Sequence, residues 1–461
     1  MKEERQERRS LGGASELGSF ELDPRVLERV ARGTRPTRRD AVAKIGIIAA
    51  VFALLGHVAL TSPASACAGG APALVWTILG AASAIYALFI IYHAVRYRPA
   101  AAAPDAELPS LTVIVPAFNE GPMVQTALLS TLEADYPRDR LEILAVDDGS
   151  TDDTWSYVDA VARAFPDRVT AVRMARNGGK RDALREGFAR ARGELVITVD
   201  SDSRLSPDAL RQITAPLIAD ARVAAVAGKV LVLNRYESVL TRLLTARFFV
   251  TFDLGRAVQS RFGAVLCCPG ALTAYRRSAV LDVLKAWSTQ TFLGAPCTIG
   301  EDRALTTWLL RRGHRTVYQS TALVETLVPP TIRGVTKMLL RWERGNVRES
   351  LVMLPTLLTP WRKTDRWWPT LEIVLDTAQY PAALVMLALA IRHFLTAPMD
   401  LLRALAAVAV IGLAQSLYCL RSERSTDLVY NVGYAVFAFI GLQWIFPYSF
   451  LTMHNGKWLT R

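Results

Sequence analysis

Cysteine is scarce in this sequence of 461 residues, which contains only five: Cys67, Cys267, Cys268, Cys297 and Cys419. No two of them have the paired spacing of a metal-binding motif, and a cytoplasmic location keeps accessible thiols reduced. We therefore exclude a cysteine-based zinc site and expect the cysteines to be structural.

The sequence also lacks the signatures of nucleic-acid binding, although its formal net charge is +12. No zinc-finger spacing, RNA-reading motif or heptad array accompanies the basic residues. Cytoplasmic Lys and Arg near the ends of membrane helices produce the same charge balance. We therefore predict no nucleic-acid partner.

Charge is absent from one long stretch, since no Asp, Glu, Lys or Arg occurs from Ile45 through Val95. Two apolar runs within it, Ile45–Thr61 and Ala71–Val95, are each long enough to cross a hydrocarbon core of about 30 Å. Basic residues flank the pair on both sides. Residues 41–98 are therefore predicted to form two transmembrane helices with both ends in the cytoplasm.

Residues 1–40 precede the first apolar run, are charged, and lack both an apolar core and a cleavage site. They do not read as a signal peptide, and we predict a basic, disordered cytoplasmic arm without assigned function. Near the other end, residues 329–366 are predicted to form amphipathic helices at the membrane interface.

Apolar runs return in residues 367–451, where we predict about three transmembrane or re-entrant helices: Leu371–Ile391, Leu401–Leu420 and Leu428–Phe450. The first run contains Glu372 and Asp376. Carboxylates within a membrane span face a protein interior or an aqueous path, because lipid exposure is costly. These two therefore line a channel, or they lie at a helix end near the interface.

Between the apolar blocks, residues 109–328 are predicted to form a soluble cytoplasmic domain. Runs rich in β-branched residues predict strands at Leu111–Val115, Leu141–Val146, Val169–Met174 and Glu194–Val199. Helical patterns separate them, at Met123–Glu133, Thr151–Ala164 and Lys180–Arg190. This alternation predicts βαβ units and a parallel α/β sheet, whose ligands bind at the carboxyl ends of the strands.

Acidic residues follow two of these strands. Asp147 and Asp148 can accept hydrogen bonds from the imide and ribose of a nucleotide, or they form a turn that caps the next helix. The one-residue spacing of Asp200 and Asp202 suits Mg²⁺ or Mn²⁺ shared with substrate phosphates, although a solvated acidic loop has the same pattern.

Basic and aromatic residues supply further candidates. Lys180 follows a Gly-Gly turn at a helix start and can bind a diphosphate, or it is a solvated charge. Arg341 and Trp342 lie on an amphipathic segment and hold diphosphate and an acceptor sugar, or they anchor the membrane interface. Asp302 precedes a helix and can act as a general base, or it favours the helix N-terminus.

Taken in order, these motifs resemble those of the inverting family 2 glycosyltransferases with a GT-A fold. Within that family the motifs most resemble those of hyaluronan synthases, chitin synthases and nodulation-type chitooligosaccharide synthases. The resemblance covers about Leu111–Ser350. The motifs that carry it are Val115–Glu120, Asp147–Gly149, Gly179–Leu184, Val199–Asp202, Gly300–Arg303 and Arg341–Trp342.

The resemblance implies an α/β GT-A domain with a mixed, mainly parallel sheet, embedded between helical transmembrane segments. It implies a multi-pass enzyme of the plasma membrane with a cytoplasmic catalytic domain. This enzyme polymerises a β-linked polysaccharide, chitin or hyaluronan-like, from a UDP-sugar with inversion, and exports it. UDP-GlcNAc is the first choice of donor, and UDP-GlcA and UDP-Glc are the others; the growing polysaccharide and the lipid bilayer are the remaining partners.

Two other functions stay open. A GT-A domain fused to membrane helices can also transfer a single sugar to a lipid phosphate carrier. An inactive membrane scaffold that binds sugar is the third, although the complete set of carboxylates argues against it.

The resemblance also implies a role for each candidate residue. It assigns Asp302 as catalytic base and Asp202 as ligand of Mg²⁺ or Mn²⁺. The nucleotide-sugar is bound by Asp147, Asp148, Lys180, Asp200 and Arg341, and the acceptor by Trp342.

The chain departs from the family pattern at two places. Met338 stands where the family has glutamine, which bears on processivity and polymer length. The last residues, within 452–461, resemble a gating segment through Trp458 and Arg461, but with leucine in place of glycine. Five full spans would leave this tail outside the cell. Either the last apolar run is partly re-entrant, or the tail is not a gate.

Overall fold

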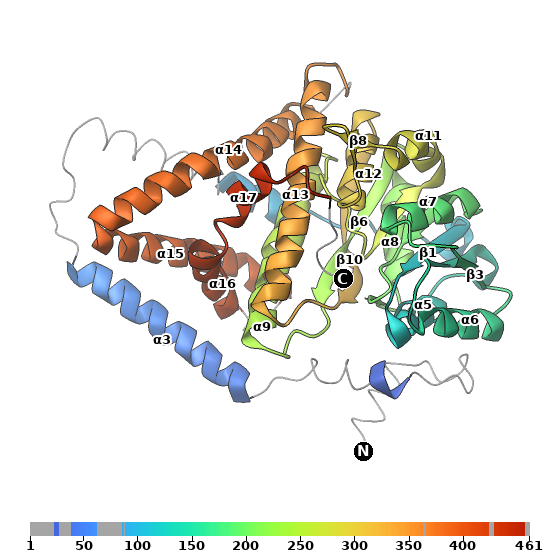
Figure 1. Cartoon of the computed structure of the whole chain (residues 1–461), viewed down its shortest axis with the longest axis horizontal. Coiled ribbons are helices and arrows are strands. Elements are labelled where there is room, and N and C mark those ends of the chain that lie inside the picture. Colours follow the sequence, from blue (N-terminus) through green and yellow to red (C-terminus); the bar gives the residue numbers. More distant parts are fainter. Residues whose placement is uncertain are drawn as a thin grey trace.

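The computed structural model describes residues 23–26, 38–61, 85–86, 88–362, 366–423 and 428–456. An α/β domain built on one large sheet occupies one side of the molecule, and long helices occupy the other (Figure 1). The predicted gating residues Trp458 and Arg461 lie outside the described residues, as does most of the predicted second N-terminal span.

The large sheet has the strand order β3-β2-β1-β4-β7-β6-β10-β5. Its strands are β1 (Leu111–Ala117), β2 (Leu141–Asp147), β3 (Val169–Arg173), β4 (Leu195–Thr198), β5 (Arg204–Leu205), β6 (Val223–Val232), β7 (Thr273–Arg276) and β10 (Arg315–Thr326). The four strands expected from the sequence are β1 to β4, and they pair in parallel. Strand β7 runs antiparallel between β4 and β6, which confirms the mixed, mainly parallel sheet that the family resemblance implied.

Helices cover both faces of this sheet, so its central strands are buried on both sides. All seven residues of β1 are buried. Successive side chains point to opposite faces, so Val113 and Val115 belong to one core and Ile114 to the other. The helices of the domain are α5 (Val124–Leu132), α6 (Thr154–Ala164), α7 (Lys180–Arg190), α8 (Ala209–Ala219), α11 (Arg277–Ser288) and α12 (Glu301–Arg311).

Two long helical segments join the sheet to the apolar helices. One runs through α9 (Val239–Phe248), the π-helix η4 (Phe249–Leu254) and α10 (Gly255–Arg261). The other is α13 (Ile332–Leu357), the amphipathic helix expected from the sequence. Short elements complete the domain: η1 (Asp105–Glu107), η2 (Gly121–Met123), η3 (Arg138–Arg140), and the hairpin of β8 (Thr291–Phe292) and β9 (Ala295–Pro296).

The apolar helices are α3 (Arg38–Thr61), residues 88–96, α14 (Trp367–Thr396), α15 (Pro398–Glu423), α16 (Leu428–Gly441) and α17 (Ile445–Leu451). By length and composition, α14 is the one helix among the described residues that could cross a membrane. The bent pair Val429–Gly441 and Ile445–Leu451, with an angle of 50°, is a broken span or a re-entrant loop. The other predicted spans stay predictions.

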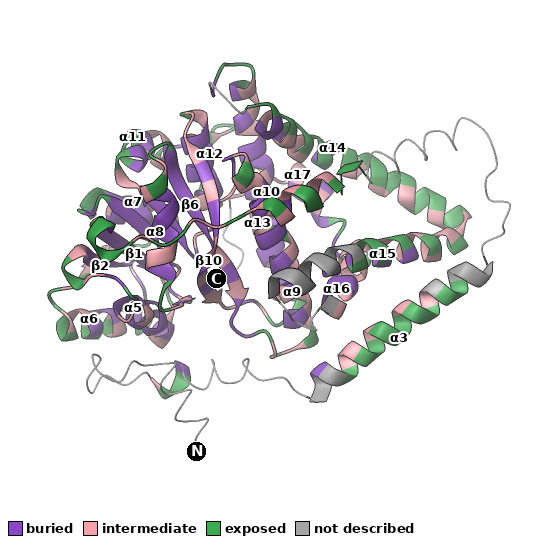
Figure 2. Ribbon diagram, turned by 180° about the vertical axis from the view of Figure 1, so that it is seen from behind, coloured by how far each residue is buried: buried purple, intermediate pink, exposed green. Residues whose placement is uncertain are grey.

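The long helices differ from the α/β domain in what they expose. Figure 2 shows α3 and α14 largely exposed and α15 partly exposed, whereas the sheet is buried. Apolar side chains are among those exposed, including Phe52, Val385 and Ile411. An exposed apolar surface of this kind is typical of contact with lipid or with another protein.

The predicted disorder of the N-terminal arm does not extend to residues 23–26. Residues 24–26 form a helical turn, and Val26 is only 1 % exposed. It packs with Met123 and Leu233 of the α/β domain.

The turn after β2 depends on a glycine. Gly149 has φ +68°, and a Cβ there would lie 2.6 Å from the backbone carbon of Arg176. We expect Gly149→Ala to lower the unfolding temperature in detergent by more than Gly294→Ala does. Gly294 also has a positive φ, of +80°, but a Cβ there has nothing within 4 Å, so only the backbone strain of about 1–2 kcal/mol applies. An equal decrease in unfolding temperature in the two variants would show that the backbone at Arg176 shifts to accommodate the added Cβ.

Candidate active site

One cavity of about 360 Å³ lies where the sheet meets the helical segments. Its lining comes from the ends of β4, β6 and β10, the loop before β7, and helices α9, α10, α12, α13 and α14. Six of the residues expected to form the site line it: Lys180, Asp200, Asp202, Asp302, Arg341 and Trp342. The structure thus brings together residues that are far apart in the sequence.

Lys180 lies between two carboxylates at one end of this cavity. Its ammonium group forms a short ion pair with Asp200 and lies 3.3 Å from Oε1 of Glu301. Burial opposes the charged form of Lys180, but the two carboxylates outweigh it and raise its pKa. The side chain is positioned because Gly179, with φ +87°, turns the chain into α7, whose first residue is Lys180.

Gly270 closes over the ion pair from the loop before β7. A Cβ at this position would lie 2.6 Å from Nζ of Lys180 and 3.0 Å from Oδ1 of Asp200. The backbone therefore approaches both charges more closely than any residue with a side chain allows.

Asp202 lies beyond Asp200 and accepts a hydrogen bond of 3.2 Å from Oγ1 of Thr326. Burial, followed by the charge of Asp200, raises the pKa of Asp202 to about 6. No group of three or more His, Cys, Asp or Glu side chains suited to a metal occurs among the described residues. The Asp200 and Asp202 pair nevertheless fits Mg²⁺ or Mn²⁺, because such ions are commonly held by one or two carboxylates together with substrate phosphates.

Asp302 and Glu301 stand side by side at the start of α12, but their pKa values move in opposite directions. Burial raises the pKa of Asp302, and the charge of Glu301 adds to the effect. Burial also opposes the charged form of Glu301, but Lys180 and Arg341 outweigh it and lower the pKa. One carboxylate is thus a fixed negative charge, while the other has a raised affinity for a proton, which is the pattern expected of a base.

The side chain of Asp302 is held by neighbouring groups. Its Oδ1 accepts a hydrogen bond of 2.7 Å from the amide of Arg303, and its Oδ2 accepts one of 3.3 Å from the amide of Gly270. Sγ of Cys267 lies 3.9 Å from the same Oδ2. Amides and a weak thiol donor orient this carboxylate, and no ion pair to it is found among the residues that the structure describes.

Asp147 and Asp148 are not brought to the cavity. Both are buried at the end of β2. The carboxylate of Asp148 accepts hydrogen bonds of 2.8 Å from the amides of Gly178 and Gly179. In this arrangement Asp148 holds the turn that presents Lys180, and contact with a nucleoside stays a prediction.

Trp342 lines the cavity beside two aromatic residues that the sequence analysis missed. Its ring centroid lies 6.0 Å from that of Phe248 and 5.8 Å from that of Phe252. The two phenylalanines are four residues apart, a spacing that by itself indicates only a helix face. The π-helix η4 begins between them, and nothing in the periodicity indicates it. Met338, which replaces the family glutamine, also lines the cavity.

The far end of the cavity reaches α14, where both carboxylates noted in the sequence are found. Glu372 accepts a hydrogen bond of 2.7 Å from Gln259, and Asp376 forms an ion pair of 3.1 Å with Arg303. Both residues line the cavity. They face the protein interior, as a carboxylate in an apolar helix should.

The C-terminal part of the described chain lies beside α13 and the segment before α12. Oγ1 of Thr452 accepts a hydrogen bond of 3.0 Å from Nε of Arg344 on α13. Oγ1 of Thr298 donates one of 2.5 Å to the carbonyl of Gly456. Since Thr298 is four residues before Asp302, the described chain ends close to the cavity.

The chain is similar to known proteins along most of its length. The model of a family described as glycosyltransferase like family 2 matches residues 109–345. An N-acetylglucosaminyltransferase of Rhizobium leguminosarum bv. viciae is 33% identical, over 82% of this chain and 89% of that protein. One of Bradyrhizobium diazoefficiens is 30% identical, over 87% of this chain and 81% of that protein.

A solved structure is similar as well. It is the mannosyltransferase PcManGT from Pyrobaculum calidifontis, in complex with GDP-Man and Mn²⁺. The TM-score is 0.54 and the identity 26%, over 78% of this chain and 97% of that one. The mixed, mostly parallel sheet is typical of the GT-A fold of glycosyltransferases.

The chain belongs to the glycosyltransferase like family 2, since the family model covers residues 109–345 and full-length relatives align along most of the sequence. It is therefore an enzyme that transfers a sugar.

Proposed function

We propose that the chain is a membrane-bound, inverting N-acetylglucosaminyltransferase that extends a β-linked polysaccharide processively from UDP-GlcNAc and exports it. The observation that carries this proposal is that one cavity joins the charged residues to the apolar helices. At one end it holds the charged groups suited to a diphosphate, Lys180 and Arg341, and at the other it reaches the apolar helix α14.

In the proposed reaction, Asp302 takes the proton from an acceptor hydroxyl as its oxygen attacks C1 of the donor sugar. The bond between C1 and the diphosphate oxygen breaks, and UDP leaves with the electron pair. Attack from the opposite face inverts the configuration, which converts an α-linked donor into a β-linked product. Lys180 and Arg341 hold the departing diphosphate, while Trp342 stacks on the acceptor sugar.

Asp200 and Asp202 would hold Mg²⁺ or Mn²⁺ together with the diphosphate. When bound, the ion neutralises charge that develops on the leaving group. The proximity of Lys180 to Asp200 keeps this acidic pair compensated in the donor-free protein.

The choice of GlcNAc rests on the relatives, which are named N-acetylglucosaminyltransferases. UDP-GlcA and UDP-Glc are the competing donors. The structural relative PcManGT was solved with GDP-Man, so the fold as such does not select the donor.

The membrane part of the proposal rests on α14 and on the exposed apolar side chains of α3, α14 and α15. We propose a multi-pass protein of the plasma membrane in which residues 41–98 and 367–451 are embedded and residues 109–328 face the cytoplasm. Glu372 and Asp376 would then begin the polar path of the product.

The test is to incubate the purified full-length protein with each radiolabelled UDP-sugar, singly and in pairs, and to size the product before and after linkage-specific hydrolases. A ladder of β-linked GlcNAc oligomers is expected. A single sugar attached to a lipid phosphate would instead favour the lipid-linked transferase, and transfer from another UDP-sugar alone would overturn the donor assignment.

Asp302→Asn keeps the shape of the base but removes its ability to accept the proton. We expect turnover to fall by about 10²- to 10⁴-fold while UDP affinity is retained. Asp282→Asn is the matched control, because that carboxylate is 54% exposed on α11 of the same domain. Near-normal synthesis by Asp302→Asn would remove Asp302 from this role.

Chelation of divalent ions should abolish synthesis, and Mg²⁺ or Mn²⁺ should restore it, because the ion is shared with the diphosphate. In Asp202→Asn, the electron paramagnetic resonance signal of bound Mn²⁺ in the presence of UDP should be lost. Full activity in excess EDTA would contradict the metal requirement.

Removing Trp458–Arg461 should lower polymer synthesis far more than UDP affinity, because these residues would close over the donor and exclude water. The position of Gly456 beside Thr298 supports this placement. Residual turnover of the truncated enzyme should shift toward hydrolysis of the donor.

The side of the membrane can be tested separately with a single cysteine placed after Arg461, in a background without other accessible thiols. Protection from an impermeant maleimide in intact cells is expected. Labelling from outside would exclude the gate.

A further inference from the structure

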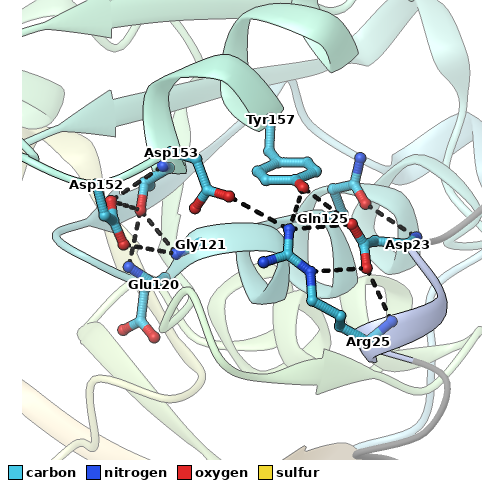
Figure 3. A network of polar contacts seen from close by, with 9 residues as sticks. Asp23, Arg25, Glu120, Gly121, Gln125, Asp152, Asp153 and Tyr157 are labelled. Carbon is cyan, nitrogen blue, oxygen red and sulfur yellow. Dashed lines mark hydrogen bonds and ion pairs between the residues drawn. The ribbon is translucent and has the colours of Figure 1, made fainter.

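A short N-terminal segment, residues 23–26, is docked on the α/β domain more than 80 residues ahead of the strands that carry the site. Figure 3 shows Arg25 between Asp23, Asp153 and Tyr157. The guanidinium of Arg25 lies 3.2 Å from both carboxylates and hydrogen-bonds the hydroxyl of Tyr157. The hydroxyl of Tyr157 in turn donates to Asp23 at 2.9 Å.

The local sequence explains why this segment forms a turn. Oδ1 of Asp23 accepts a hydrogen bond of 2.8 Å from the amide of Arg25, as an N-cap residue does. Pro24 occupies the first helical position, where its fixed φ suits a helix and its missing amide proton is not needed. The amide of Asp23 also donates to Oε1 of Gln125, at 3.4 Å.

Val26 holds the turn on the domain through apolar contacts. It packs with Met123 and Leu233, and Leu327 is packed against the same cluster. Leu327 also lines the cavity of the candidate active site. A buried N-terminal side chain therefore contacts the wall of that cavity through one layer of apolar residues.

The loop beneath the segment needs support, because two of its residues have left-handed backbone conformations. Asn119 has φ +52° and Gly121 has φ +54°. A Cβ on Gly121 would lie 3.1 Å from Oδ1 of Asp153, the residue that also pairs with Arg25. The amide of Gly121 donates to Oδ2 of Asp152 at 3.1 Å, so the loop and the docked segment are held by two adjacent carboxylates, Asp152 and Asp153.

The same loop is connected to both acidic clusters. The amide of Asn119 donates to Oγ of Ser150 at 3.0 Å, next to the Asp147 and Asp148 turn. Oε1 of Glu120 accepts a hydrogen bond of 3.0 Å from Oγ of Ser201, which lies between Asp200 and Asp202. A shift of the loop would therefore move residues on both sides of the donor site.

We propose that residues 23–26 act as a clamp that positions the loop 119–123 and, through it, the donor side of the active site. The proposal rests on the function proposed above, since it takes a nucleotide-sugar as the ligand of that side. These four residues are positioning residues. An exposed ion pair such as Arg25 with Asp153 adds little stability, so the clamp acts mainly on geometry.

The test uses full-length protein in detergent or nanodiscs. Val26→Asp places a charge in the apolar cluster and should release the segment, with Val26→Ile as the conservative variant that keeps it docked. Arg163→Ala is the matched control, because Arg163 pairs with Asp159 on α6 and none of its contacts involves residues 23–26.

In Val26→Asp we expect the KM for UDP-GlcNAc to rise by about fivefold or more, with kcat changed by less than about twofold. Amide hydrogen exchange of residues 119–121 should become faster, because their hydrogen bonds to Ser150, Asp152 and Thr154 lose the support of the docked segment. Val26→Ile and Arg163→Ala should match the wild type in all three measurements.

Two results would overturn the clamp. One is an unchanged KM and unchanged exchange in Val26→Asp. The other is a fall in unfolding temperature and kcat with no change in KM, which would assign the segment a purely structural role. Failure of the wild type to use UDP-GlcNAc would count against the proposed function instead, while the hydrogen-exchange comparison would still test the docking.

Discussion

The contact of Lys180 with Asp200 and Glu301 is the constraint on which the arrangement of the site depends. It joins three elements that are distant in sequence: the start of α7, the loop after β4 and the start of α12. Removing one partner from such a partly buried cluster leaves charge without compensation, which is strongly destabilising. The cluster therefore holds the donor side of the cavity together before any ligand arrives.

The same cluster sets the electrostatics of the reacting groups. Burial raises the pKa of Asp302, and the negative charge of its neighbour Glu301, which is ion-paired with Lys180, raises it further. Two adjacent carboxylates thus acquire different properties from their surroundings. Asp302 and the Lys180 cluster can then lie in one cavity without neutralising each other.

Helix α13 carries the site toward the apolar helices. It bears Arg341 and Trp342 on the cavity and packs against α12, α14 and α17. Arg303, next to Asp302, pairs with Asp376 of α14. A displacement of α14 would therefore shift the start of α12, which carries the proposed base.

The sequence alone determined much of this protein, because local patterns carry strong signals. Continuous β-branched runs predicted β1 to β4, since strands buried on both faces need apolar residues at every position. Asp200 and Asp202 follow β4, at the sheet edge where ligands bind, so their place could be predicted from the strand pattern. Lys180 and Asp302 open helices, and only the family resemblance joined them to the same predicted site. The apolar character of α14 was also readable from composition.

Only the tertiary structure decided which of these residues meet. The antiparallel strand β7 brings Gly270 onto Lys180 and Asp200, and sequence patterns do not report strand direction. Asp148 faces the Gly178 amide rather than the cavity. The sequence could not show this, because an acidic turn that binds a nucleotide and one that caps a helix have the same local pattern. The docking of Val26 depends on contacts about 100 and 200 residues away with Met123 and Leu233, and such contacts arise only when the whole core has formed.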